Sequence, residues 1–137
     1  MNIIITKKDQ EKINMCLNKM VSSSFAHCVL LVDRSGQLIA HQGNSPTIDI
    51  LSLAVLTAAN FGATAEIARL LGEEEFTLLF HKGKSENVYF SAIGDHAIMV
   101  TLFNDNTSLG LVRLRINKII EELSIIVCSI FEKGKAH

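Results

Sequence analysis

A Gly-Lys-Ser run at residues 83–85 is the first candidate for chemistry, because such a run closes the phosphate-binding loop of many nucleotide-binding proteins. That motif begins with another glycine, and the corresponding position in this chain is Leu78. The run also lies between two predicted strands, whereas a phosphate-binding loop leads into a helix. We therefore expect no nucleotide site at Gly83 and no bound cofactor.

The histidine, cysteine and acidic residues form no catalytic or metal-binding pattern. His27 and Cys28 are adjacent in a predicted strand, and adjacent strand residues point to opposite faces of a sheet. Three other histidines lie on strands or strand ends and are expected to be structural: His41, His81 and His96. The three cysteines include no Cys-x-x-Cys pair, so we expect no metal site. We expect the acidic run at residues 73–75 to be a solvated corner, and the protein to have no active site of its own.

Composition indicates a single domain over residues 1–137, with an ordered core at about residues 8–131 and a short polar C-terminal tail. Apolar residues make up 48% and charged residues 20%, a usual balance for a globular protein. The net charge of −1 is unfavourable for binding nucleic acid, which needs a basic surface. The apolar run at residues 3–5 is too short for a signal peptide, so we expect a cytoplasmic location.

Hydrophobic spacing predicts three helices and five strands in the order α-β-β-α-β-β-β-α. The predicted helices cover residues 8–24, 49–71 and 109–130, with Thr107 or Ser108 as the cap of the last. The predicted strands cover residues 27–32, 37–41, 76–81, 87–93 and 96–103. The last strand is apolar on both faces, so we place it in the middle of the sheet. This order predicts an α/β fold with a single five-stranded antiparallel sheet and helices on both of its faces.

The predicted helix at residues 49–71 is apolar on nearly all sides, which requires burial on more than one side. Its polar residues Asn60, Glu66 and Arg69 argue against a membrane span, so we expect none. Gly62 costs the helix about 1 kcal/mol relative to alanine, which points to a packing reason. The alternative is that this alanine-rich segment is simply a good helix former. We favour a helix that packs on its own sheet and also on another chain.

At about 100° per residue, this central helix divides into three surfaces. The first is assigned to the sheet: Ile50, Ala54, Ala58, Phe61, Ala65 and Ala68. The second is assigned to a dimer contact: Leu53, Thr57, Asn60 and Thr64. The third is assigned to a protein partner: Val55, Ala59, Gly62, Glu66 and Arg69, with Ala63 beside them. The small residues of this third surface allow the backbone of a partner to come close.

Three blocks of sequence resemble the roadblock (dynein light chain) domain family. They are LTAANFGATAEIARLLGEEEF at residues 56–76, HKGKSENVYF at 81–90 and FNDNTSLGLVRLRI at 103–116. With the order of elements, the resemblance covers nearly the whole chain, and within the family it is to bacterial MglB-type proteins. It implies a roadblock/longin/profilin-like fold.

The resemblance also implies a homodimer and a protein partner. Roadblock domains are similar to one another in pairing through the central helix and the third strand, which here carries Phe76, Leu78 and Phe80. MglB-type proteins look like regulators of MglA, a small Ras-like GTPase of cell polarity and motility, whose GTP hydrolysis they stimulate by remodelling it without inserting an arginine. The alternatives are a scaffold that docks a GTPase or other proteins without changing hydrolysis, and a small-molecule sensor.

We predict that the isolated chain binds neither GTP nor GDP, because Leu78 replaces a required glycine and residues 83–85 lead into a strand. Isothermal titration calorimetry with each nucleotide and magnesium should detect no binding. A micromolar dissociation constant for either nucleotide would contradict this prediction.

Overall fold

The computed structural model describes residues 4–44, 47–74 and 79–135, and its elements follow the predicted order. The helices are α1 (Lys7–Ser24), α2 (Ile50–Leu71) and α3 (Leu109–Lys135). The strands are β1 (Cys28–Asp33), β2 (Leu38–Gly43), β3 (Leu79–Lys82), β4 (Asn87–Ile93) and β5 (Ala97–Phe103).

The strands form one five-stranded antiparallel sheet, as predicted, and their order in it is β2-β1-β5-β4-β3. β5 lies in the middle and all of its residues are buried, which confirms the prediction from its two apolar faces. It pairs with β1 from Cys28↔Leu102 to Asp33↔Ala97 and with β4 along its whole length. Within the described residues, β3 is an outer strand that pairs with β4 through Leu79–Lys82.

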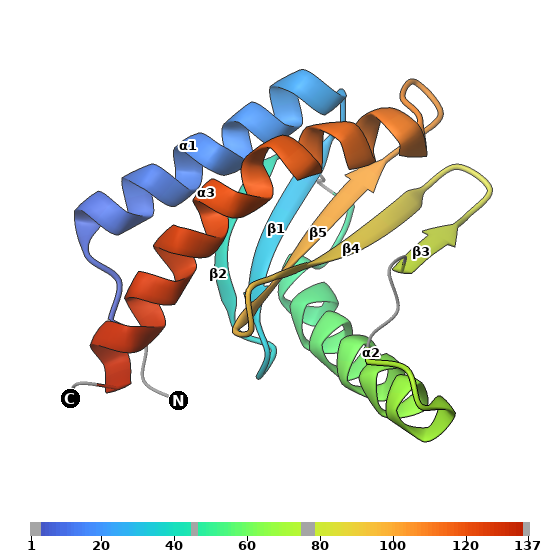
Figure 1. Cartoon of the computed structure of the whole chain (residues 1–137). Helices are drawn as coiled ribbons and strands as arrows, with labels where there is room; N and C mark the ends of the chain where they lie inside the picture. The colour runs from blue at the N-terminus through green and yellow to red at the C-terminus, as the bar shows by residue number, and fades with distance from the viewer. Residues whose placement is uncertain (1–3, 45–46, 75–78, 136–137) are drawn as a thin grey trace.

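The helices cover both faces of the sheet, which confirms the predicted fold class (Figure 1). α1 and α3 pack against each other on one face, where Leu17 and Leu123 meet inward-facing strand residues such as Met99. α2 covers the opposite face, where Ala54 packs with strand residues such as Val100. The sheet therefore separates two apolar cores, and α2 is the helix that stands apart from the other two.

Each end of α2 has a defined cap. Asp49, which the sequence analysis places in the helix, is instead its N-cap and accepts hydrogen bonds from the Ser52 amide at 3.1 Å and the Ser52 hydroxyl at 2.7 Å. The hydroxyl bond is the main reason that the pKa of Asp49 lies below its ordinary value. Gly72 ends the helix with a φ of 80°, as its position after the last apolar residue predicts.

Most boundaries agree with the prediction to within two residues, and the end of α3 differs by more. α3 continues to Lys135 instead of ending near residue 130, because Phe131 is still buried and its ring stacks on His96 with 4.6 Å between ring centroids. Of the two predicted caps, Thr107 and Ser108, it is Ser108 that caps this helix, since the Ser108 hydroxyl accepts a hydrogen bond from the Leu111 amide at 3.2 Å. The first residues of the predicted strand at 76–81 lie outside the described residues.

Candidate partner-binding surface

Large apolar side chains on α2 point away from the sheet. Among the described residues, ten large apolar side chains are more than half exposed, and six of them belong to this helix. These six are Leu51, Val55, Leu56, Ile67, Leu70 and Leu71. Apolar area concentrated on one element is typical of a surface that binds another protein.

By length and composition, α2 is also the one helix in the described part of the chain that is able to cross a membrane, and 11% of its apolar window is buried. A single such helix is weak evidence for a membrane span. The Glu66 and Arg69 side chains are both more than half exposed on its outer side, where a lipid contact would be costly.

The side of α2 that faces the sheet combines small buried residues with larger ones that are partly buried. Ala54, Thr57 and Ala68 are its buried residues. The side chains of Ile50, Leu53 and Phe61 pack partly buried against the same core as Ala54. Thr57, which was assigned to a dimer contact, is 1% exposed in the protomer, so it is already covered by its own chain. The rest of the predicted dimer surface is also half-buried in the protomer: Leu53, Asn60 and Thr64. Ala65, which was assigned to the sheet by angle, is exposed.

The surface assigned to a protein partner is exposed throughout. Its residues are Val55, Ala59, Gly62, Ala63, Glu66 and Arg69. Among the described residues, no atom lies within 4 Å of a Cβ atom built on Gly62, so none of them requires glycine there. We call the run of Val55, Ala59, Gly62, Glu66 and Arg69 the α2 stripe.

The two charges of the α2 stripe are paired with each other. The Arg69 Nε atom donates to Glu66 Oε1 at 3.0 Å, and the Arg69 Nη2 atom contacts the same oxygen. This hydrogen bonding raises the pKa of Arg69, so the guanidinium stays charged. Because Glu66 and Arg69 satisfy each other on the helix surface, the stripe presents no strong net charge of its own.

A second outward surface was not assigned from the sequence. Leu56, Ile67 and Leu70 lie beside the α2 stripe and are exposed by 65%, 51% and 73%, with Ala63 among them. We call these four residues the apolar stripe. Its signal in the sequence is the helical spacing of its members, which places them opposite the buried Ala54.

The outer strand β3 supplies a backbone edge rather than the predicted aromatic contact. The Phe80 ring packs edge-to-face on Phe103, with 5.9 Å between ring centroids, and belongs to the core under α1 and α3. Its side chain is therefore turned into the protomer. Phe76 and Leu78, the other two predicted contact residues on this strand, lie outside the described residues. The β3 backbone remains at the edge of the sheet, where another strand can pair with it.

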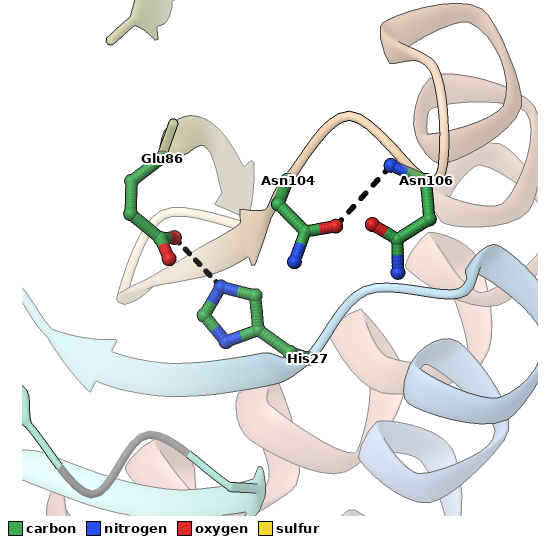
Figure 2. A network of polar contacts seen from close by, with 4 residues as sticks. All are labelled: His27, Glu86, Asn104 and Asn106. Carbon is green, nitrogen blue, oxygen red and sulfur yellow. Dashed lines mark hydrogen bonds and ion pairs between the residues drawn. The ribbon is translucent and has the colours of Figure 1, made fainter. Parts of the chain in front are cut away.

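A polar cluster closes one end of the sheet (Figure 2). His27 Nε2 lies 2.7 Å from Glu86 Oε2, which joins the start of β1 to the turn before β4. In the neighbouring loop, the Asn106 amide donates to Asn104 Oδ1 at 3.2 Å. Within the described residues, no group of three or more histidine, cysteine or acidic residues is arranged to hold a metal ion. Sequence reasoning missed the His27–Glu86 contact because the two residues are distant in the chain.

A cavity of about 260 Å³ lies between the middle of α2, strand β4 and α3. Phe61 and Phe90 line it on the α2 side, and Arg113 and Asn117 line it on the α3 side. The described residues around it include no paired nucleophile and base. The described residues therefore make a weaker case for a catalytic site than for a protein contact on α2.

We predict that Gly62→Ala raises the free energy of unfolding by up to about 1 kcal/mol, because alanine favours a helix and its Cβ meets no neighbouring atom. Urea denaturation followed by circular dichroism measures the change. Gly36→Ala is the matched control and should destabilise the protein, since Gly36 has a φ of +96° and its Cβ would lie 3.1 Å from the Val55 Cα. A loss of stability in Gly62→Ala would show that Gly62 is already covered in the isolated protein.

Comparison with known proteins agrees with this geometry. Residues 12–103 match the model of the Roadblock/LC7 domain. Myxococcus xanthus MglB is 43% identical, and the match covers 86% of this chain and 96% of that one with a TM-score of 0.81. The gliding protein MglB of Thermus thermophilus is 29% identical over 93% of this chain and 97% of that one, with a TM-score of 0.86. An MglB structure with a tetrameric arrangement is also 29% identical, covering 94% and 97% of the two chains, with a TM-score of 0.88. The chain therefore belongs to the roadblock/LC7 domain family and is similar within it to MglB proteins.

Proposed function

We propose that the protein is a cytoplasmic homodimer that binds a small Ras-like GTPase of the MglA type and stimulates GTP hydrolysis by remodelling it. The observation that carries this proposal is the exposed α2 stripe, which is bare around Gly62. The similarity to MglB proteins supports the class of partner.

The shape of the α2 stripe suits a partner that presents backbone. Ala59 and Gly62 have almost no side chain, so a loop of another protein can approach the helix closely. The nucleotide-dependent switch segments of a GTPase are loops of this kind, whose order changes with the bound nucleotide. A regulator that binds one arrangement of such a loop more tightly shifts the GTPase toward that arrangement.

We assign the catalytic groups for GTP hydrolysis to the partner GTPase rather than to Arg69. The Glu66 carboxylate holds the Arg69 guanidinium on the surface of its own helix. An arginine that enters the active site of a GTPase must release such a contact first. We therefore propose that the protein accelerates hydrolysis by positioning groups that the GTPase already carries.

The second copy is proposed to cover the apolar stripe and to extend the sheet at β3. Fully burying a side chain such as Leu56 or Leu70 is worth about 1.5–3 kcal/mol. In a two-fold contact each buried side chain counts twice, once for each protomer. The corrected burial pattern favours this stripe over Thr57, which the protomer itself covers.

We predict a homodimer whose mass, measured by light scattering after size exclusion at low micromolar concentration, is twice 15.1 kDa. Leu70→Asp should shift the protein to monomer, because it places a charge in the apolar stripe. Met15→Asp is the matched control, since Met15 is 62% exposed on α1 and should leave the dimer intact. A monomeric mass for the unmodified protein would overturn the dimer.

We predict that Gly62→Arg abolishes stimulation of an MglA-like GTPase, because a long side chain blocks close approach to the α2 stripe while meeting no atom of its own protomer. Phosphate release from the GTP-loaded GTPase measures stimulation. Gly110→Arg is the matched control, because Gly110 is exposed on α3 across the sheet and should stimulate normally. Full stimulation of GTP hydrolysis by Gly62→Arg would show that the partner surface is misassigned. If the unmodified protein binds the GTPase without stimulating hydrolysis, a scaffold is favoured instead.

We also predict that Arg69→Ala loses far less activity than the roughly 10³–10⁵-fold contribution of an inserted arginine. The reason is that Arg69 is paired with Glu66 and contributes to docking alone. Hydrolysis rates at saturating regulator measure the effect. If the variant binds normally and hydrolysis falls by such a factor, Arg69 acts in the partner's active site and the remodelling mechanism is wrong.

A further inference from the structure

The turn between β1 and β2 lies directly against the α2 stripe. Gly36 has a φ of +96°, and a Cβ atom built on it would lie 3.1 Å from the Val55 Cα and 3.7 Å from the Ala58 Cβ. Any other residue would push the turn away from the helix. The backbone of Gly36 therefore borders the same surface that the proposed function assigns to the GTPase.

This turn is held in one conformation from inside. Asp33 is 2% exposed, and its Oδ1 atom accepts hydrogen bonds from the Ser35 amide at 3.0 Å, the Ser35 hydroxyl at 2.7 Å and the Gln37 amide at 2.8 Å. On the opposite side, the Arg34 amide donates to the His96 carbonyl at 3.2 Å. The backbone that carries Arg34 is thus fixed to the sheet and to the β4–β5 turn.

The Arg34 side chain lies over α2. Its Cζ atom is 5.1 Å from the centroid of the Phe61 ring, a distance at which the ring face attracts a guanidinium. Arg34 is exposed, and it takes part in none of the ion pairs of the described residues. Arg69, by contrast, is held by Glu66. The cation that borders the α2 stripe and still has its N–H groups available is therefore Arg34.

We propose that Arg34 is a docking residue of the α2 surface, which pairs with a carboxylate on the GTPase, and that Phe61 is the residue that positions it. This inference rests on the proposed function. A planar guanidinium binds a carboxylate through two parallel hydrogen bonds, and contact with a ring restricts where the guanidinium lies before the partner arrives. A carboxylate on the partner surface is favoured over the phosphate of the bound nucleotide, because reaching into the nucleotide site would require the guanidinium to leave the Phe61 ring.

The test uses the full chain and an MglA-like GTPase loaded with a non-hydrolysable GTP analogue. Arg34→Ala should raise the dissociation constant by about tenfold to a hundredfold. Arg34→Lys should recover part of the lost affinity. Phe61→Leu should weaken binding by a smaller factor, since it keeps the apolar volume and removes the ring face. Lys118→Ala removes one positive charge from α3 on the other face of the sheet and should bind like the unmodified protein.

Hydrolysis at saturating regulator separates docking from chemistry. The saturated rate with Arg34→Ala should stay within about twofold of the unmodified protein, since the charge acts in binding and not in the reaction. A collapse of the saturated rate would place Arg34 on the nucleotide phosphate and overturn the proposal. If Arg34→Ala binds the GTPase like the unmodified protein while Gly62→Arg no longer binds, the docking role of Arg34 is rejected and the proposed function is kept. Absence of any binding by the unmodified protein would reject the proposed function together with this inference.

Discussion

The rest of the structure depends on the contact between α2 and the sheet. Ala54 is fully buried in the second core, and Ile50, Leu53 and Phe61 pack around that core as partly buried side chains. These residues occupy the side of the helix that faces the sheet, so the other large side chains of α2 point outward. Leucines and isoleucines such as Leu56, Ile67 and Leu70 are therefore exposed. Burying each of them against another chain would be worth about 1.5–3 kcal/mol, so this apolar surface suits a protein contact.

The outer side of α2 carries few charges. Glu66 and Arg69 satisfy each other, so the α2 stripe is polar there without a strong net charge. Arg34 comes from a different part of the chain and places one positive charge over Phe61, beside the α2 stripe. A bare apolar helix with one placed cation is better suited to recognising a particular partner than a helix that is apolar alone, because a charge rejects partners that cannot pair with it.

The opposite face of the sheet performs a different task. α1 and α3 pack on it with their large side chains inward, and together they bury most of the apolar core. The His27–Glu86 contact and the loop around Asn104 close one end of the sheet (Figure 2). These features hold β1 and β5 in place, so that the helix on the other side has a rigid platform. The larger apolar core therefore lies on one face of the sheet, and the helix with the exposed apolar surface lies on the other.

Much of the fold follows from local pattern. The periodicity of each segment predicts the order of elements, and the two apolar faces of β5 predict its central place. The exposure of the α2 stripe also follows from local pattern, since the charged residues Glu66 and Arg69 lie on the solvent-facing side of the helix. These properties depend on residues that are neighbours in the chain or on one helix face.

Only the tertiary structure decides how α2 is rotated against the sheet. Helical spacing gives the angles of Thr57, Leu56 and Ala54 relative to one another. It does not say which of them faces the sheet, because that depends on how β1 and β5, from other parts of the chain, pack against α2. For this reason Thr57 is turned inward and Leu56 outward. The placement of Arg34 over Phe61 likewise requires the Gly36 turn to lie on the helix. A contact between segments distant in the chain has no periodic signal in a single sequence, because it arises when the whole sheet brings those segments together.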